Sequence, residues 1–430
     1  MKTNLYTIIA FTLFVAGCNS FSQPKPLSQQ TEIKKTITTG QLSTKEYTFY
    51  HDLLKKHFET QLLNRGFNGG ILVAKNGVIV YEDYKGFRDF RTRDSLTAET
   101  PMHIASASKT FTGMAMLQLV QQGKLGLEDT LGKFFPGFPY PGVTVKTLLN
   151  HRSGLPNYVH YLENMNWDKK VSVTNQDVLN SLFTMKPAKE SFPDRRFSYS
   201  NTNYVLLALI IEKITGESYP SYMKRTIFDS LLMHDTWVAT PADSLRITPS
   251  FDGRGRYWQT DFLDLTYGDK NIYSTPRDLL KWEIAVSTGQ IINPEMQEAA
   301  YTAYSNERPS KHNYGLGWRL LSMPNDKKII YHNGRWHGSN AAFARLIDEK
   351  ATIIIIGNKY NSNIYASAKK AYGIFGEYSQ LAPDEDEDKL TINHKTDKAN
   401  EALANFSVSD LSSAKKKGIS TPRLKFLWQL

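Results

Sequence analysis

The 430-residue chain contains a single cysteine, Cys18. One cysteine excludes an internal disulfide framework and a zinc site built from several cysteines. The apolar stretch at residues 5–17 has 13 residues, fewer than the roughly 20 that a membrane-spanning helix needs. The Gly-x-Ser-x-Gly, Walker and His-Glu-x-x-His motifs are missing, and no pair of the ten histidines has the spacing of a helical metal site. The sequence therefore predicts no metal and no cofactor.

Acidic residues are fewer than basic ones, and 52 Lys and Arg against 42 Asp and Glu give a net charge of +10. The basic residues are spread along the chain, and no RNA-binding, zinc-finger or basic-zipper pattern accompanies them, so we expect no nucleic-acid partner. A basic surface also suits an anionic envelope environment or acidic substrates. With 40% hydrophobic and 22% charged residues, the chain can bury a sizeable core.

The amino-terminus reads as an export signal. Met1-Lys2 is charged, residues 5–17 have the length of a signal-peptide apolar region, and Val15-Ala16-Gly17 precedes Cys18. This arrangement resembles the bacterial lipobox, in which the cysteine is lipidated and becomes the new amino-terminus. We expect 1–17 to be a lipoprotein signal peptide and Cys18 to carry a lipid anchor to the membrane of a bacterial cell envelope. The alternative is an ordinary signal peptide whose apolar region ends near a cysteine.

The remaining sequence indicates an α+β domain over residues 46–380. Polar residues 18–45 read as a flexible tether, and residues 381–430 as a polar carboxy-terminal tail. Strand patterns at both ends with helices between them predict one antiparallel sheet built from amino- and carboxy-terminal segments, flanked by helices, with a mostly helical insert at about 125–265. The expected elements are a helix near 47–62, a hairpin at 70–81, buried helices at 111–120 and 205–214, strands at 314–320, 329–332, 341–347 and 352–356, and a helix at 365–378.

A Ser-x-x-Lys motif is the candidate for the chemistry. Residues three apart on a helix share a face, so the lysine amine can reach the serine hydroxyl and activate it. The chain holds six copies, which start at Ser22, Ser106, Ser221, Ser367, Ser412 and Ser413. The copy at Ser106 begins the most apolar helix and has small neighbours that leave room for a ligand. An ordinary helix-capping serine is the alternative for Ser106.

Residues 103–109, His-Ile-Ala-Ser-Ala-Ser-Lys, resemble the nucleophile motif of the class C β-lactamase-like serine hydrolases. That family includes β-lactamases, D-alanyl-D-alanine carboxypeptidases, D-aminopeptidases and esterases. Its other landmarks follow in order over about 46–380, and the resemblance implies the β-lactamase/transpeptidase-like fold. They are the hairpin at 71–77, the segment 148–156 that resembles Leu-Leu-Thr-His-Thr-Ser-Gly-Leu-Pro, the Tyr-x-Asn motif at 199–201, the signatures at 272–279 and 314–318, and a His-x-Gly strand at 332–334.

By this resemblance Ser106 is the nucleophile and forms an acyl-enzyme. Lys109 accepts its proton or holds the local field, and Tyr199 relays a proton to the leaving group and later activates water. Asn201 hydrogen-bonds the substrate amide and Lys109. The oxyanion hole consists of the backbone N–H groups of Ser106 and Arg335. A second Tyr-Ser-Asn, at 304–306, lies among polar residues and reads as a surface loop.

The third motif departs from the family pattern. His332 replaces the usual lysine, and Asn333, Gly334 and Arg335 are the implied substrate-binding residues. The family's strand often reads His-x-Gly-Gly-x-x-Gly, whereas here Arg335, Trp336 and His337 stand between Gly334 and Gly338. One hypothesis is that Arg335 recognises a substrate carboxylate as a bidentate partner; the alternative is that its side chain points into solvent. Residues 268–271, Gly-Asp-Lys-Asn, also replace a commoner glycine-rich turn.

The resemblance therefore implies a metal-free serine hydrolase, anchored to the membrane by its lipid, that cleaves a small-molecule or peptide substrate through a Ser106 acyl-enzyme. The substrate is an ester, an amide or a β-lactam. A D-alanyl-D-alanine carboxypeptidase-like or esterase role leads, and a dedicated β-lactamase is the alternative. A non-catalytic penicillin-binding or sensor lipoprotein is a further alternative, which the intact Ser106, Lys109, Tyr199 and Asn201 argue against.

Overall fold

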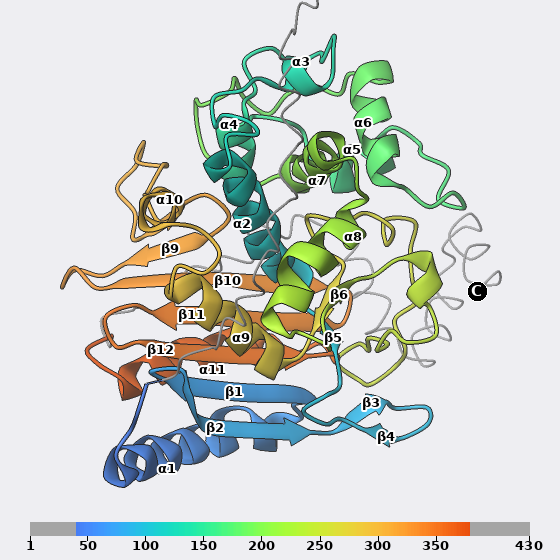
Figure 1. Cartoon of the computed structure of the whole chain (residues 1–430). Helices are drawn as coiled ribbons and strands as arrows, with labels where there is room; N and C mark the ends of the chain where they lie inside the picture. The colour runs from blue at the N-terminus through green and yellow to red at the C-terminus, as the bar shows by residue number, and fades with distance from the viewer. Residues whose placement is uncertain (1–39, 379–430) are drawn as a thin grey trace, which may run out of the picture. The chain divides into compact units, whose positions relative to one another are not determined.

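A computed structural model describes residues 40–378 of the chain (Figure 1). The expected signal peptide at 1–17, Cys18 and the tail at 381–430 lie outside the described residues. The first described helix, α1, begins at Thr44 with Ser43 as its N-cap. The side chains of Ser43 and Glu46 cap each other's backbone, which starts the helix two residues before the expected domain boundary at 46.

The framework is a seven-stranded antiparallel sheet in the order β2-β1-β12-β11-β10-β9-β8. Its amino-terminal hairpin adds to the carboxy-terminal strands through β1 and β12, which pair from Gly69 with Gly357 to Lys75 with Ala351. The strands are β1 Gly69–Lys75, β2 Val78–Lys85, β8 His312–Tyr314, β9 Arg319–Ser322, β10 Lys328–Trp336, β11 Ser339–Leu346 and β12 Ala351–Gly357.

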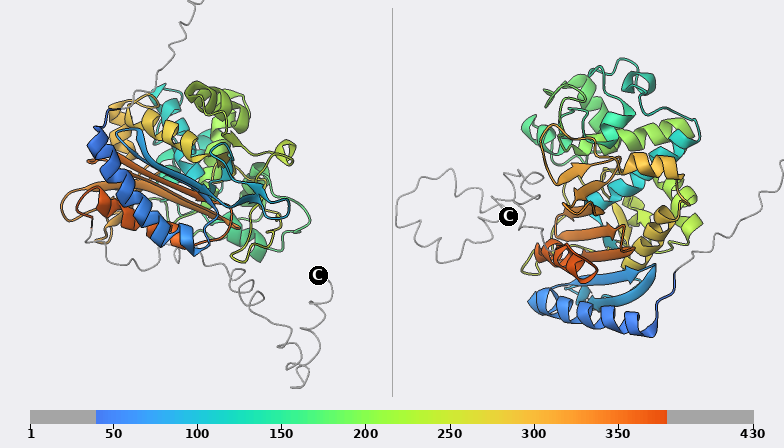
Figure 2. Two further views of the ribbon diagram at one scale, coloured as in Figure 1. Left: turned by 90° about the horizontal axis from the view of Figure 1, so that it is seen from below. Right: turned by 90° about the vertical axis from the view of Figure 1, so that its left-hand side faces the viewer.

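Both faces of the central strands are covered, which explains the consecutive apolar residues of β1 and β12, Ile71–Ala74 and Ile353–Ile356. Ile71 and Ile353 point to one core, against α1 Thr44–Gln61 and α11 Asn363–Ala371. Their neighbours Leu72 and Ile354 point to the other core, which contains α2 Ser108–Gln121 and α9 Pro276–Ser287. Figure 2 shows α1 and α11 on one side of the sheet and the remaining helices on the other.

The predicted hairpin at 70–81 is confirmed as β1 and β2, joined by Asn76 and Gly77. Both turn residues have positive φ, 53° and 75°. That geometry matches the right-handed twist of the strands and favours an Asn-Gly pair. The predicted strands at 329–332, 341–347 and 352–356 are confirmed as β10, β11 and β12.

Two predicted elements are wrong in extent. The single strand expected at 314–320 is two strands, β8 and β9, that turn back on each other at Gly315–Trp318. Gly317 has φ of +92°, and its backbone lies against Gly113 of α2, so the chain turns where a side chain would not fit. The helix expected at 365–378 ends as α11 at Ala371 and continues as the short 3-10 helix Tyr372–Ile374.

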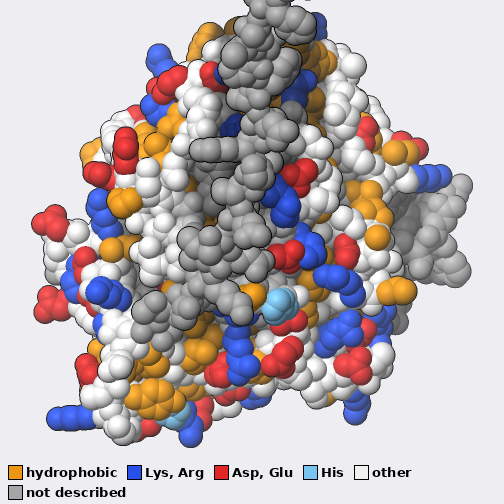
Figure 3. All heavy atoms as spheres, in the orientation of Figure 1, with side chains coloured by type: hydrophobic (Ala, Val, Ile, Leu, Met, Phe, Trp, Pro, Cys, Tyr) orange, Lys and Arg blue, Asp and Glu red, His pale blue; other side chains and the backbone are white. Residues whose placement is uncertain are grey.

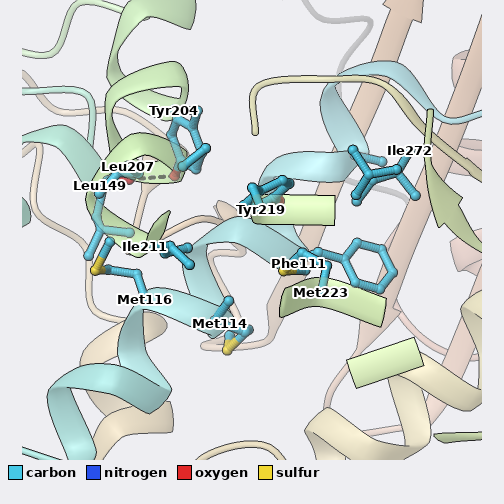
Figure 4. Packing of buried hydrophobic residues seen from close by; sticks show 14 of the residues in the cluster. Phe111, Met114, Met116, Leu149, Tyr204, Leu207, Ile211, Tyr219, Met223 and Ile272 are labelled. Atoms are coloured by element: carbon cyan, nitrogen blue, oxygen red, sulfur yellow. Dashed lines mark hydrogen bonds between the residues drawn. The ribbon is translucent and has the colours of Figure 1, made fainter. Parts of the chain in front are cut away.

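A mostly helical region is inserted between α2 and β7 and packs on the second core (Figure 1). The predicted buried helices at 111–120 and 205–214 are confirmed as α2 and α7, which lie against each other (Figure 4). The Tyr204 hydroxyl of α7 donates to the backbone oxygen of Leu149, 2.7 Å away. The inserted helices are α3 Leu131–Phe134, α4 Val145–Leu149, α5 Tyr158–Asn164, α6 Asn175–Thr184, α7 Asn201–Thr215 and α8 Tyr219–Met223.

A second, three-stranded sheet in the order β5-β7-β6 lies beside the start of α2. β5 leads directly into the Ser106 motif, so this sheet fixes where α2 begins. The predicted α+β class, with an antiparallel sheet from both ends of the chain and a helical insert, is confirmed. The remaining elements are β3 Phe87–Asp89, β4 Asp94–Ser95, β5 Met102–His103, β6 Trp237–Val238, β7 Ile272–Ser274 and α10 Pro294–Ala300.

Candidate active site

Ser106 lies in a one-turn 3-10 helix, Ala105–Ala107, immediately before α2. Its neighbour Ala105 has φ of +49°, a conformation that costs a residue with a side chain about 1 kcal/mol. Ser106 is partly exposed, whereas Ala105 and Ala107 are fully buried. The strained turn therefore presents the hydroxyl group to solvent while its flanking residues are held in the core.

The Lys109 ammonium group is completely surrounded by acceptors. It lies 3.1 Å from Ser106 Oγ, 2.9 Å from Asn201 Oδ1 and 2.7 Å from the backbone oxygen of Asp269. The side chain is fully buried, and an ammonium group has three protons to donate. Each of these protons has an acceptor, one of which is the Ser106 hydroxyl oxygen.

Tyr199 brings a second polar group to the nucleophile, because its hydroxyl lies 3.1 Å from Ser106 Oγ. Two cations face its ring: Lys109 Nζ lies 5.0 Å from the ring centroid and the Arg319 guanidinium 5.3 Å. At these distances both cations interact favourably with the π-face of the ring, which helps to hold it in place. Ser106, Lys109, Tyr199 and Asn201, which the sequence singled out, are thus brought together at hydrogen-bond distance.

The ring of Tyr199 is supported from behind by His151, with ring centroids 4.2 Å apart. His151 Nδ1 accepts the backbone N–H of Ser200, 3.2 Å away. Burial, and then the positive charge of Lys109, hold the pKa of His151 well below its usual range, so its ring stays neutral. A neutral ring packs against Tyr199 without placing a second buried positive charge beside Lys109.

Strand β10 runs directly beside the Ser106 turn at Gly334. A Cβ atom at this position would lie 2.2 Å from the Ile104 backbone oxygen and 3.0 Å from the Ser106 backbone nitrogen. Only glycine fits such a close approach. The structure thus sets the backbone of β10 next to the Ser106 N–H, where the resemblance expects the oxyanion hole; the role of the Arg335 N–H in it stays a prediction.

The remaining residues of the His-x-Gly strand, His332, Asn333 and Arg335, differ from one another in burial and in their contacts. His332 is fully buried, with Nε2 3.0 Å from the Tyr314 hydroxyl and Nδ1 2.7 Å from the Asn333 backbone oxygen. Its ring centroid lies 6.5 Å from that of Tyr199, so the His332 ring is a near neighbour of the Tyr199 ring. Asn333 is partly exposed. The Arg335 guanidinium lies 4.6 Å from the centroid of the Tyr360 ring and is half-buried, which differs from a side chain that points freely into solvent.

Sequence reasoning missed two contributors to the site. Asp269 supplies the backbone oxygen that Lys109 binds, and His103 Nδ1 accepts the Ala105 N–H at 3.2 Å while its Nε2 lies 3.1 Å from Asn271 Oδ1. The sequence carried a signal for both: His103 opens the nucleophile motif, and the segment 268–271 departs from the family pattern. The contacts of Lys109 with Asp269 and of His103 with Asn271 span 160 and 168 positions of sequence, so no local pattern shows them.

Within residues 40–378, one group could chemically hold a metal ion: Asp261, Asp264 and His337 place three ligand atoms within 4.8 Å of one another. Asp264 Oδ1 already accepts the Trp336 indole N–H at 2.7 Å and lies 2.9 Å from His337 Nε2. These hydrogen bonds account for the way in which the three side chains are arranged.

A model of the beta-lactamase family matches residues 54–373. The chain therefore belongs to the beta-lactamase family, and it is a serine hydrolase of that family. Among its relatives, penicillin-binding protein 4* of Bacillus subtilis is 32% identical over 73% of this chain and 74% of its own. Protein flp of Staphylococcus aureus is 27% identical over 74% of this chain, which spans 61% of that relative's length.

Solved structures of the same fold extend this similarity. An octameric penicillin-binding protein homologue from Pyrococcus abyssi is 25% identical with a TM-score of 0.66, covering 77% of this chain and 79% of that one. The D-amino acid amidase of Ochrobactrum anthropi is 24% identical with a TM-score of 0.62, covering 75% and 98%. At that identity the amidase shows the fold alone.

We expect the unfolding free energy to fall as the pH drops from 6.5 to 4. Burial lowers the pKa of His103 from 6.5 to about 4, so the unfolded chain binds this proton at a higher pH than the folded one. The folded state loses up to about 3 kcal/mol across that window. Protonated Nδ1 also cannot accept the Ala105 N–H, so the turn that carries Ser106 loosens.

Denaturant unfolding at several pH values measures this effect. His103→Gln removes the titrating ring while its amide can donate to Asn271, so the variant's unfolding free energy should vary less with pH than that of the wild type. Equal pH dependence in the two proteins would contradict the assignment to His103.

Proposed function

We propose that the protein hydrolyses small amide and ester substrates through an acyl-enzyme on Ser106, in a D-alanyl-D-alanine carboxypeptidase-like or esterase role. The observation that carries this proposal is that Ser106 Oγ lies 3.1 Å from both Lys109 Nζ and the Tyr199 hydroxyl. A nucleophile with a fixed cation and a phenol within reach is the arrangement that acyl transfer needs. The names of the relatives, a penicillin-binding protein and a D-amino acid amidase, are consistent with small D-aminoacyl substrates.

In this mechanism Tyr199 handles the proton. The reactive form in this proposal is the one in which Tyr199 has given up its proton; because Lys109 has an acceptor for each of its protons, the Ser106 proton then passes to the Tyr199 oxygen as Oγ bonds to the substrate carbonyl carbon. The phenol then gives that proton to the departing amine or alcohol as the bond to carbon breaks. Water repeats the cycle: its proton passes to Tyr199, its oxygen attacks the ester, and Ser106 leaves with the proton.

Asn201 orients the substrate in this proposal. Its side-chain oxygen accepts a hydrogen bond from Lys109, which leaves its amide nitrogen to donate a hydrogen bond to the substrate's own carbonyl group. The Ser106 and Arg335 backbone N–H groups bind the developing oxyanion, and each such donor lowers the barrier by about 3–4 kcal/mol. Arg335 beside Tyr360 offers a guanidinium group for a substrate carboxylate.

We further propose that the protein works at the bacterial cell envelope, held there by a lipid on Cys18. The lipobox-like residues 15–18 support this location, and several acyl chains anchor a protein firmly. Among the described residues 40–378, no helix combines the length and apolar character needed to cross a bilayer. On the face shown in Figure 3, basic side chains are interspersed with acidic ones, which suits a small substrate better than a polyanion.

Intact-protein mass spectrometry after brief incubation of residues 19–430 with a penicillin tests this function. A covalent adduct that persists favours the carboxypeptidase-like role, because slow deacylation traps the acyl-enzyme. Rapid loss of free penicillin without a stable adduct would instead identify a β-lactamase. Absence of an adduct, of penicillin loss and of hydrolysis of D-alanine amides and esters would contradict the proposal.

A further inference from the structure

The side chain of Arg152 joins two loops beside the active site. Its Nε and Nη2 atoms donate to Asp194, to Oδ1 and to the backbone oxygen, each at 2.6 Å. Its Nη1 atom donates to Glu307 Oε2 at 2.8 Å and to Ser305 Oγ at 3.3 Å. The side chain of Arg152 is 10% exposed, that of Glu307 34% and that of Asp194 74%, so the ion pair with Glu307 is the better shielded from solvent and the stronger of the two.

Glu307 links Arg152 to the segment that carries Tyr199. Its Oε1 atom accepts the backbone N–H of Phe197 at 2.8 Å, two residues before Tyr199. Hydrogen bonds from Phe197 and Arg152 hold the pKa of Glu307 below its usual range although burial raises it, so the carboxylate stays charged. Ser305, in the second Tyr-Ser-Asn sequence, accepts from the same Arg152 side chain. The loop that holds the second Tyr-Ser-Asn sequence is thus connected to the segment that precedes the first.

The segment that Arg152 holds has no regular secondary structure. Residues 185–200 connect α6 to α7 without a helix or strand, so no ladder of backbone bonds fixes their position. Besides the Arg152 side chain, the backbone oxygens of His151 and Arg152 accept from Ser198 and Asp194, at 2.9 and 2.7 Å. The position of Tyr199 thus depends on bonds to a few residues from distant parts of the chain.

We propose that Arg152, Asp194 and Glu307 form a positioning network that sets the distance between the Tyr199 hydroxyl and Ser106 Oγ, and with it the rate of acylation. The inference rests on the proposed acyl-transfer function. The segment that resembles Leu-Leu-Thr-His-Thr-Ser-Gly has arginine at 152 where the pattern has threonine, and a threonine side chain has no guanidinium group to make these bonds. An error of about 1 Å in such a distance costs up to about 100-fold in rate.

The experiment compares the 4-nitroanilide and the 4-nitrophenyl ester of D-alanine. The aniline must be protonated as it leaves, whereas 4-nitrophenolate leaves without a proton, so a displaced phenol slows the amide more. A smaller fraction of folded enzyme lowers both rates by the same factor. The ratio of the amide kcat/KM to the ester kcat/KM therefore separates positioning from stability.

We expect Arg152→Met and Glu307→Ala each to lower this ratio by about five-fold or more. The double variant should be no worse than the single ones, because the residues act as one unit. Glu307→Gln keeps an oxygen that can accept the Phe197 N–H and should restore most of the ratio. The matched control is Arg345→Met, which breaks a buried ion pair with Glu283, 2.9 Å long, away from Tyr199; it should leave the ratio unchanged.

An unchanged ratio in both Arg152→Met and Glu307→Ala would overturn the network, even where the rates on the two substrates fall equally. Glu307→Ala keeps this test available should Arg152→Met fail to fold. Ser106→Ala in the same assays tests the proposed function separately. Hydrolysis that survives in Ser106→Ala removes that function, whereas Ser106-dependent hydrolysis with an unchanged ratio removes only the network.

Discussion

Ser106→Ala is expected to lower turnover of ester and amide substrates by at least about 10⁴-fold and to abolish the penicillin adduct. The loss is large because Ser106 Oγ is the atom on which Lys109 and Tyr199 converge, and a nucleophile cannot be replaced by its neighbours. The unfolding free energy should change by no more than about 1 kcal/mol, since the partly exposed hydroxyl group carries little of the packing. Steady-state kinetics and denaturant unfolding measure the two effects.

Ser221→Ala is the matched control. Ser221 also begins a Ser-x-x-Lys sequence, yet it is exposed on α8 and its hydroxyl accepts only from Ser218 among the bonds of the described residues. This variant should keep wild-type turnover. Wild-type turnover in folded, purified Ser106→Ala protein would instead remove Ser106 as the nucleophile.

Gly334→Ala is expected to lower kcat/KM by about 100-fold or more and the unfolding free energy by about 1–3 kcal/mol. The added methyl group would lie 2.2 Å from the Ile104 oxygen and 3.0 Å from the Ser106 nitrogen, and both are backbone atoms that cannot rotate away. Either β10 or the Ser106 turn must shift, which costs stability and misplaces the nucleophile against the oxyanion donors. Kinetics on an activated ester and thermal unfolding measure the two losses.

Gly373→Ala gives the comparison for this change. A Cβ atom at Gly373 meets no atom within 4 Å, so the substitution adds the same methyl group without a clash. We expect its activity and stability to match the wild type. Wild-type kinetics in Gly334→Ala would mean that β10 does not press on the Ser106 turn as the structure has it.

Much of the fold could be predicted because its signals are local. The Asn76-Gly77 pair between two apolar runs specified the first hairpin, and the apolar residues of α2 and α7 specified two buried helices. The strand at 314–320 was predicted wrongly. Its alternating residues, Tyr-Gly-Leu-Gly-Trp-Arg-Leu, read as one strand, whereas the reversal depends on Gly317 lying against Gly113 in another element.

The candidate site divides in the same way. Ser106, Lys109, Tyr199 and Asn201 stand in short motifs that could be recognised one by one, and the structure brings them together as those motifs imply. His332 also stands in a motif, but its full burial beside Tyr314 follows from packing that its neighbours in sequence do not reveal.

The sequence by itself determined the class of the protein, the position of the proposed nucleophile and the order of the elements, because each depends on spacing within a few residues. Only the tertiary structure decided that the Asp269 oxygen completes the ring of acceptors around Lys109, and that Arg152 reaches Glu307 across 155 positions of sequence. Such contacts join residues that are distant in the chain. Their energies depend on distance and burial after folding, and neither quantity is encoded in any local pattern.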